Sequence, residues 1–239
     1  MGIKKAKEAV KLTPIEPAKR PVAVIFELET VVLNYRAVLF QALSKQLKEK
    51  GVKLSLGLFI KHCLYRTPQQ FIEPLLAALG KRLSPDKFRM ELAELLHAEF
   101  KHAGLPPEFK KLTQALTEQS VSVGCIHHLP KELFDEMAPR TGLAQLPITF
   151  FHCQPEGAGF VTVENWLKTL KQMAITPSRS MAIASSSHAT RAALTVGMKC
   201  MAIPDSYTGF DDFSGVDFII PRLQDVSATK IAQILNFTL

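Results

Sequence analysis

The feature that most constrains the fold is the spacing of short apolar segments along the chain. Residues 21–26 form one such segment, and the next of the same kind is 121–126. From there on, short β-branched segments alternate with longer segments of helical periodicity. Such alternation is typical of βαβ units, whose strands pair in parallel. The expected strands are 21–26, 121–126, 146–151, 180–184, 199–203 and 217–220.

The first two expected strands are separated by a long helical region. Ile72, Leu75, Leu76 and Leu79 follow the i, i+3, i+4, i+7 spacing of one helix face. A connection of roughly 90 residues is far longer than a crossover needs. We therefore expect an α/β protein with a doubly wound parallel sheet and an inserted all-helical cap. The expected boundaries are 21–34 and 118–239 for the core and 35–117 for the cap.

Charge and composition narrow the class of protein. The 239 residues carry a net charge of +7, and residues 1–20 hold six Lys or Arg against two Glu. We expect these residues to form a flexible basic leader. No basic run with interleaved aromatics indicates a nucleic-acid partner, and no apolar run is long enough for a membrane helix. Four cysteines without a CxxC pair favour reduced thiols and a cytoplasmic location.

Polar side chains follow four of the expected strands. In open α/β sheets, ligands bind beyond the carboxyl ends of the strands, so these positions are the candidate site. The residues are Glu27 and Glu29 after the first strand, His127 and His128 after the second, His152 and Cys153 after the third, and Ser185, Ser186 and Ser187 after the fourth.

Three stretches of the chain resemble the haloacid dehalogenase-like superfamily. Val24–Glu29 is similar to the opening signature of that superfamily, a hydrophobic strand followed by Asp-x-Asp-Gly-Thr. Arg191–Met198 resembles the helix and glycine turn after its last acidic motif, and Tyr207–Asp217 resembles a stretch near the end of such enzymes. The nearest branch has a helical cap and includes phosphoglycolate phosphatase-like and β-phosphoglucomutase-like enzymes. The resemblance implies a Rossmannoid core.

The resemblance also implies roles that several residues here do not match. In the superfamily, the two Asp residues of the signature act as nucleophile and as general acid/base. The corresponding residues here are Glu27 and Glu29, whose side chains are each one methylene longer. The Ser or Thr that holds the phosphoryl group corresponds to His127, and the phosphate-binding Lys to Phe160. The acid that binds Mg²⁺ corresponds to Ser185, although Mg²⁺ prefers carboxylate oxygens.

These departures lead to two hypotheses of different kinds. The first is a degenerate member without phosphotransfer activity that binds a small molecule or a protein partner and needs no cofactor. The alternative is a hydrolase, a phosphatase of a small phosphorylated metabolite, with Glu27 as nucleophile and Mg²⁺ held by Glu27 and Glu29. The sequence identifies neither the ligand nor the oligomeric state.

Other interpretations of the same residues remain open. His127, His128, His152 and Cys153 could meet Glu27 in a zinc site, since imidazole and thiolate suit Zn²⁺. We expect no resident metal, and Glu27, His127 and His152 are only weak candidates as ligands. The run from Ser185 to Ser187 is expected to cap a helix or to bind an anion there. A Ser185–His188 nucleophile pair lacks the flanking glycines of an elbow.

Overall fold

The structure is a computed structural model that describes residues 21–100, 104–153 and 159–235. The basic leader expected at 1–20 lies outside the described residues. Within them, none of the helices combines the length and the apolar character that crossing a membrane requires.

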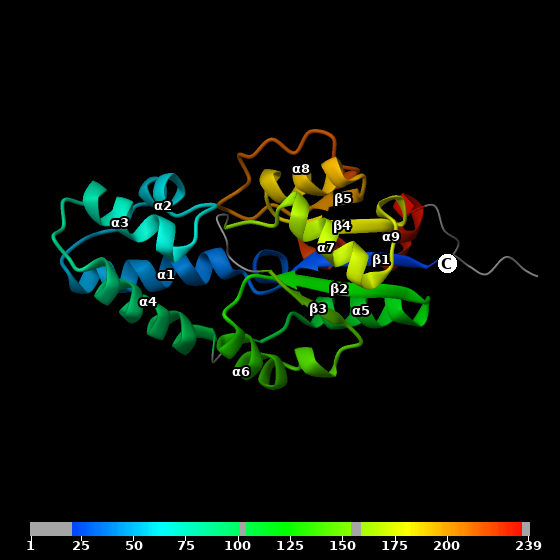
Figure 1. Cartoon of the computed structure of the whole chain (residues 1–239), viewed down its shortest axis with the longest axis horizontal. Coiled ribbons are helices and arrows are strands. Elements are labelled where there is room, and N and C mark those ends of the chain that lie inside the picture. Colours follow the sequence, from blue (N-terminus) through cyan, green and yellow to red (C-terminus); the bar gives the residue numbers. More distant parts are fainter. Residues whose placement is uncertain (1–20, 101–103, 154–158, 236–239) are drawn as a thin grey trace, which may run out of the picture.

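A six-stranded sheet forms the centre of the molecule (Figure 1). All neighbouring strands pair in parallel, in the order β3-β2-β1-β4-β5-β6. The α/β fold class predicted from the alternation of segments is therefore confirmed. The strands are β1 (Val22–Glu27), β2 (Val121–His127), β3 (Thr149–His152), β4 (Ser180–Ala184), β5 (Lys199–Ala202) and β6 (Phe218–Ile219).

Strand β1 is central, and all six of its residues are buried. Successive side chains of a strand point to opposite faces. Val24 and Phe26 accordingly belong to one hydrophobic cluster, and Ala23 and Ile25 to another. This explains why a central parallel strand is apolar at every position and does not alternate.

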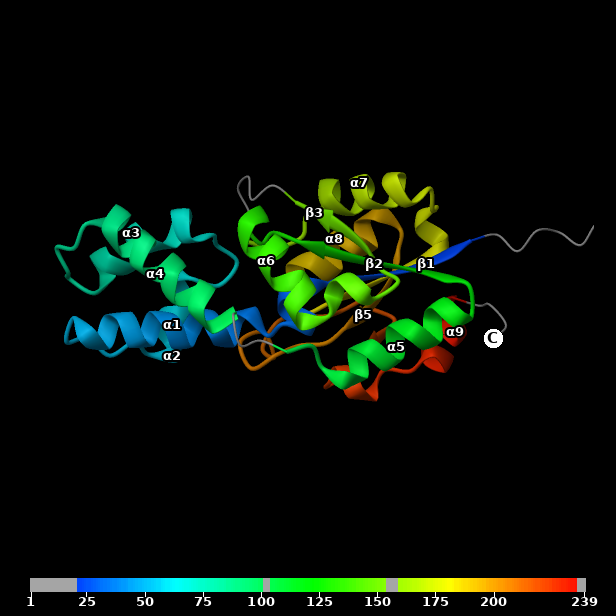
Figure 2. The same ribbon diagram turned by 90° about the horizontal axis from the view of Figure 1, so that it is seen from below.

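Helices cover both faces of the sheet (Figure 2). Helices α5 (Pro107–Glu118), α6 (Lys131–Thr141) and α9 (Ala228–Leu235) pack in the cluster that contains Phe26. Helices α7 (Val163–Met173) and α8 (Ser187–Val196) pack in the cluster that contains Ile25. Short helical turns complete the core: a π-helical turn at Leu28–Val32 and 3-10 turns at Leu143–Gln145, Pro177–Arg179 and Leu223–Asp225.

Four helices between β1 and β2 form a separate layer, on the left of Figure 1. They pack around their own cluster, which includes Leu43, Phe59, Phe71 and Leu92. We call this layer the cap. Its helices are α1 (Tyr35–Glu49), α2 (Leu56–His62), α3 (Pro68–Ala78) and α4 (Pro85–Phe100).

The fifth helix of the expected cap belongs to the core. Phe109, Leu112 and Leu116 of α5 pack against the sheet, and the ring of Phe109 meets that of Phe26 edge-on with centroids 5.2 Å apart. The apolar face of α5 is thus buried against strands and not against the cap helices. The division into cap and core with a boundary at residue 117 stays a prediction, and we propose that the cap ends before α5.

A core loop after β5 reaches into the cap. Tyr207 of this loop is buried in the cap cluster, and its ring lies 5.2 Å from that of Phe59 and 6.0 Å from that of Phe40. Asp211 of the same loop accepts a hydrogen bond from the hydroxyl of Tyr65, in the cap connection between α2 and α3. The loop is therefore a main link between cap and core.

Gly159 makes a second link. Its backbone N–H donates to the carbonyl oxygen of Tyr65 at 3.1 Å. A Cβ atom at this position would lie 2.6 Å from the backbone nitrogen of Arg66, much closer than real Cβ atoms approach. Only glycine therefore lets the connection that leads into α7 lie directly against the backbone of the cap.

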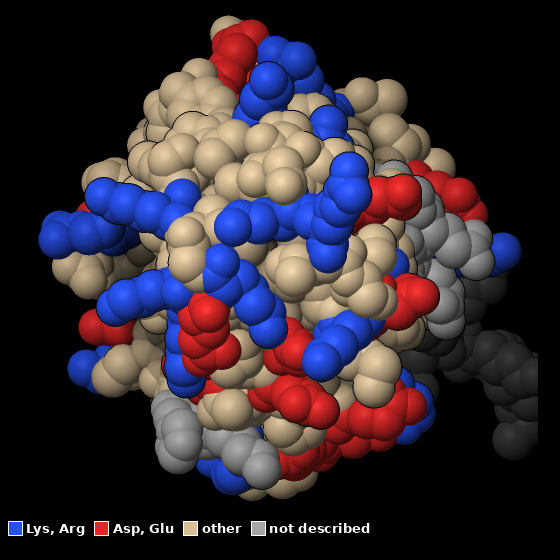
Figure 3. All heavy atoms as spheres, turned by 90° about the vertical axis from the view of Figure 1, so that its left-hand side faces the viewer, with Lys and Arg blue, Asp and Glu red and all other residues tan. Residues whose placement is uncertain are grey.

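Positive charge gathers on the cap. Residues 35–100 carry 11 Lys and Arg against 6 Asp and Glu. Figure 3 looks onto the outer end of the cap and shows Lys and Arg spread over the upper and middle parts of that face, with Asp and Glu gathered in its lower part. Together with residues 1–20, the cap accounts for the positive net charge of the chain.

Candidate functional site

The predicted polar residues lie together at the carboxyl end of the sheet, where β1, β2, β3 and β4 terminate. Glu27 ends β1, His127 ends β2 and His152 ends β3, and the last two are direct neighbours in the register. Ser185 follows β4, which pairs with β1 on the other side. The parallel pairing thus places these side chains at one end of the sheet, on the side of the cap (Figure 1).

The carboxyl group of Glu27 is buried and already hydrogen-bonded. Only 3% of the residue is exposed. Its Oε2 accepts from the backbone N–H of Ser185 at 3.0 Å, and the hydroxyl of Ser185 lies 3.5 Å from the same oxygen. One of the two carboxylate oxygens of Glu27 is therefore held by the first residue after β4.

Arg36 contacts the hydroxyl of Ser185 from the cap side. Its Nη1 donates to Ser185 Oγ at 2.8 Å and to Asp205 Oδ2 at 2.7 Å. Arg36 is buried, with 6% of the residue exposed. Asp205 is held in turn, because its Oδ1 accepts from the backbone N–H of Tyr207 at 2.8 Å. The hydroxyl of Thr208 donates to the carbonyl oxygen of Ser185 at 2.7 Å and closes this network.

Glu29 lies in the wide helical turn after β1 and is also buried. Its Oε1 accepts a hydrogen bond from the backbone N–H of His128. Burial raises the pKa of Glu29 to about 8, against the opposing effect of that hydrogen bond. Glu29 is thus mostly protonated at neutral pH. The 3.9 Å contact between its Oε1 and the Nδ1 of His128 is therefore not an ion pair there.

His127, the last residue of β2, and His128, which follows it, are held in their neutral form. Burial, together with the neighbouring His152 and His128, lowers the pKa of His127 to about 4. Burial also lowers the pKa of His128 to about 4, despite a hydrogen bond with Asn165 that acts the other way. The ring of His127 stacks on Phe134, and its Nδ1 has no hydrogen-bond partner among the described residues.

The donor set at this edge does not fit Mg²⁺. Mg²⁺ requires hard oxygen ligands, usually carboxylates. Here Ser185 offers a hydroxyl, and that hydroxyl faces the guanidinium of Arg36, which would repel a second cation. Across residues 21–100, 104–153 and 159–235, no three His, Cys, Asp or Glu side chains are arranged to hold a metal ion. The structure therefore does not assemble the zinc set of Glu27 with the histidines and Cys153.

Phe160 and the serine run meet the cap. The ring of Phe160 lies 6.2 Å from that of Tyr65 and 4.7 Å from that of His188. Ser186 caps α8 through a hydrogen bond from Ala189 N at 3.2 Å. The position expected to hold a phosphate-binding Lys therefore holds an aromatic contact between the core and the cap.

The N–H groups at the start of α8 are also engaged. Ser187 N donates to Asp211 Oδ2 at 2.9 Å, so an internal carboxylate already stands where an anion would bind. The structure also keeps Ser185 and His188 apart, because the hydroxyl of Ser185 faces Arg36 while His188 packs against Tyr65.

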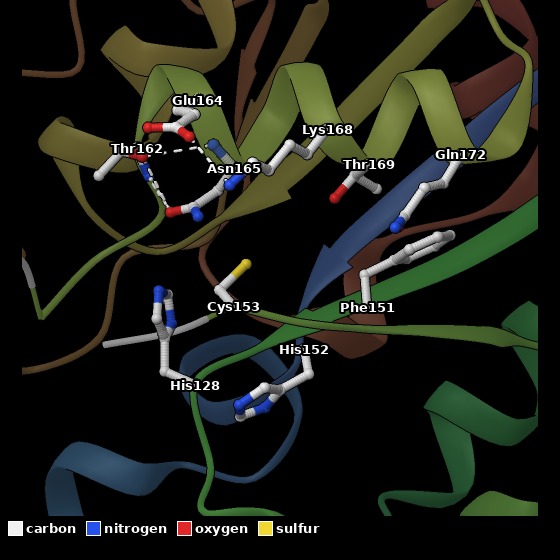
Figure 4. A pocket seen from close by; sticks show the side chains of 10 residues that line it. All are labelled: His128, Phe151, His152, Cys153, Thr162, Glu164, Asn165, Lys168, Thr169 and Gln172. Atoms are coloured by element: carbon white, nitrogen blue, oxygen red, sulfur yellow. Dashed lines mark hydrogen bonds and ion pairs between the residues drawn. The ribbon is translucent and has the colours of Figure 1, made fainter. Parts of the chain in front are cut away.

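A cavity of about 190 Å³ opens beside the histidines. Figure 4 shows Asn165 and Lys168 of α7, together with the N-cap residue Thr162, on one side and His128, His152 and Cys153 on the other. Glu164, Thr169, Gln172 and Phe151 complete the lining. Lys168 pairs with Glu164 at 2.9 Å, and both side chains are largely exposed. This cavity is lined by hydrogen-bonding groups of a kind that hold a small polar ligand.

Arg36, Asp205 and Lys168 are the site residues that sequence reasoning missed or left unassigned. A signal for Arg36 was present, because it lies on the same helix face as the buried Leu43 and Leu47. A cation on a buried helix face needs a partner. Nothing in the sequence identifies that partner as Asp205, which is 169 positions away.

Comparison with known proteins shows which solved structures share this fold. No protein-family model matches the chain. Protein CbbY of Cereibacter sphaeroides is 25% identical over 138 residues, which are 58% of this chain and 54% of that protein, so the chain matches about half its length.

Solved structures cover more of the chain. A haloacid dehalogenase (HAD) family hydrolase from Deinococcus radiodurans, with bound phosphate and sodium, has a TM-score of 0.72 at 16% identity over 91% of this chain and 98% of that one. A predicted phosphoglycolate phosphatase from Haemophilus somnus has a TM-score of 0.72 at 16% identity over 91% and 100%. At these identities the likeness is one of fold.

Proposed function

We propose that this chain, which has the fold of the haloacid dehalogenase-like superfamily with a helical cap, binds a small anionic molecule such as a phosphate ester and does not transfer its phosphoryl group. The observation that carries the proposal is the contact of Ser185 with Arg36. Phosphoryl transfer depends on positioning and on neutralising charge at the reacting oxygens. A hydroxyl that faces a buried guanidinium does not provide a divalent-cation site.

The cavity beside α7 is the proposed binding site. Lys168 and Asn165 supply N–H donors, and the neutral imidazole of His128 offers either a donor or an acceptor. The Deinococcus hydrolase of the same fold binds phosphate, which supports an anionic ligand for this chain. A cytoplasmic location also remains a proposal, supported by Cys63, Cys125, Cys153 and Cys200, all buried free thiols.

A second candidate function is hydrolysis of a small phosphate ester, and the names of the structural neighbours favour it. Glu27 would attack phosphorus, and Glu29, protonated at neutral pH, would donate its proton to the leaving oxygen. Against this, attack tolerates little displacement, and a 1 Å error costs about 100-fold in rate. Glu27 also has its Oε2 engaged by Ser185 N.

Turnover of an aryl phosphate separates the two candidates. The purified protein is assayed with Mg²⁺, Mn²⁺ or Co²⁺ beside a Glu27→Gln variant, which keeps an acceptor oxygen for Ser185 N. We expect the two proteins to show the same background rate. Hydrolysis by the wild type that Glu27→Gln abolishes would establish the phosphatase and overturn the first proposal.

Binding of inorganic phosphate tests the site itself. Titration calorimetry should show that Lys168→Gln weakens binding by at least about tenfold, since a charge-assisted hydrogen bond contributes roughly 1.5–3 kcal/mol. Lys171→Gln is the matched control, because Lys171 lies on the same helix but does not line the cavity. Equal losses in both variants would indicate a general charge effect and no site.

A further inference from the structure

The guanidinium of Arg36 sits at the centre of the carboxyl edge and is not part of the proposed ligand cavity. It comes from the first helix of the cap, yet its Nη1 reaches two core groups, Ser185 Oγ at 2.8 Å and Asp205 Oδ2 at 2.7 Å. The side chain is 7% exposed and that of Asp205 17%. Burying a charged pair is costly, so such a pair is retained only where its geometry is well satisfied.

The surroundings of Arg36 are ordered around it from several elements. Asp205 is fixed by Tyr207 N, and its own N–H donates to Thr208 Oγ1 at 3.1 Å. The ring of Tyr65 lies beneath the guanidinium, 6.0 Å from its central carbon. Carboxylate, hydroxyl and aromatic face are the groups that a planar cation prefers. The pocket around this side chain is therefore built for a positive charge.

We propose that Arg36 is the resident cation of this site, and that it holds through Ser185 and Asp205 the place where a divalent ion would otherwise bind. The inference rests on the proposed function, since a metal-dependent phosphatase would need that place free. It explains why a hydroxyl stands at residue 185. A carboxylate there would pair with Arg36 and would not become a metal ligand.

The consequence is that residues 36 and 185 exclude a metal ion jointly. Ser185→Asp adds the hard oxygens that a divalent ion prefers but leaves the guanidinium in contact with them. Arg36→Gln removes the charge but leaves only a hydroxyl. Only the double variant combines a new carboxylate with a site free of positive charge, close to Glu27 and Asp205.

Manganese binding, measured by electron paramagnetic resonance without any phosphate ligand, tests this coupling. Mn²⁺ is the probe because it takes the same oxygen ligands as Mg²⁺. We expect the double variant Arg36→Gln with Ser185→Asp to bind Mn²⁺ at least about tenfold more tightly than Ser185→Asp alone, since a unit charge a few ångströms away strongly opposes a cation. The wild type and Arg36→Gln should bind no better than Ser185→Asp.

The matched control is Arg191→Gln combined with Ser185→Asp. Arg191 is an exposed arginine on α8 that pairs with Asp212, so its loss removes the same charge without opening the site. This control should behave as Ser185→Asp alone. Equal Mn²⁺ affinity of Ser185→Asp and the Arg36 double variant, or an equal gain from the Arg191 double variant, would overturn the inference.

A second measurement covers the case in which the double variant does not fold. The wild type is titrated with inorganic phosphate in EDTA and in Mg²⁺. A resident cation predicts the same affinity in both, and a requirement for Mg²⁺ would overturn the inference. Absence of phosphate binding in both buffers would refute the proposed function, and the manganese comparison of wild type, Ser185→Asp and Arg36→Gln would then decide on Arg36. Tight Mn²⁺ binding by the Ser185→Asp variant would refute the inference on Arg36. Absence of Mn²⁺ binding by that variant would support the inference.

Discussion

Glu27 and Glu29 are two residues apart and lie in different environments. Glu27 is held by a backbone N–H from the neighbouring strand end. Glu29 is buried deeply enough that its pKa rises to about 8, so it carries a proton at neutral pH. Differences in burial and hydrogen bonding between two carboxyl groups set acid and base roles in enzymes. Here the burial of Glu29 also makes the free energy of unfolding depend on pH.

The protonation of Glu29 predicts a pH dependence of stability. Its pKa is about 8 in the folded protein and 4.5 in the unfolded chain, so between these values the folded state binds one more proton. Stability should therefore fall as pH rises through this window, by about 1.4 kcal/mol per pH unit from this group. Glu29→Gln keeps an acceptor for His128 N and removes the charge.

Urea unfolding of the wild type and Glu29→Gln at pH 5 and at pH 8.5 checks this expectation. The free energy of unfolding of the variant, relative to that of the wild type, should increase by about 1–4 kcal/mol from pH 5 to pH 8.5. This range corresponds to ionisation of Glu29 over one to three pH units. Glu164→Gln is the control, since Glu164 is exposed at the surface. A constant difference between Glu29→Gln and wild type at both pH values would contradict burial of an ionisable group.

At the residue scale, the chain order predicted which residues lie at the ends of the strands, but not which residues they contact. Residues after strand ends follow from the chain order, so Glu27, His127 and Ser185 could be named in advance. Their partners depend on contacts between distant segments, and Arg36 meets Ser185 across 149 positions. No local pattern contains that information.

The loop after β5 is the element that best explains how cap and core fit together. It places Asp205 on Arg36, Tyr207 in the cap cluster and Asp211 on Tyr65. The sequence resemblance covered this stretch but gave no role to its residues. Contacts between the loop and the cap arise only in the folded chain, so periodicity could not reveal them.

Truncation of Tyr207 tests the loop as a link. The residue is 7% exposed and packs on two aromatic rings, so Tyr207→Ala should lower the free energy of unfolding by about 3 kcal/mol. Phe210→Ala is the control, because Phe210 is 62% exposed in the same loop and should change stability by less than about 0.5 kcal/mol. Chemical unfolding measures both, and similar losses would show that the loop does not anchor the cap through Tyr207.

At the element scale, the helical spacing of apolar residues predicts that a helix forms but not which layer it packs against. The helical spacing of residues in α3 and α4 predicted their type correctly. The same kind of spacing in α5 did not show which layer its apolar face would meet. A helix that packs on a sheet and one that packs on other helices expose the same apolar stripe in sequence.

At the scale of the whole molecule, the layers are connected by shared residues. Tyr35 and Val38 of α1 pack against both the sheet cluster and the cap cluster. The alternation of segments predicted the parallel sheet and the inserted helices. It did not predict a cap held against the core, because that arrangement depends on Arg36, Tyr65 and Tyr207 together.

Gly159 has a consequence for tracing the ancestry of this arrangement. A side chain of any size at that position would push the connection into α7 away from the cap backbone at Arg66. Related proteins in which this connection lies directly against the cap backbone must therefore keep glycine at position 159. In relatives with a space between the connection and the cap, the residue at this position is free to vary. One column of an alignment, read beside an arginine at position 36, would then separate the two groups without any structure being solved.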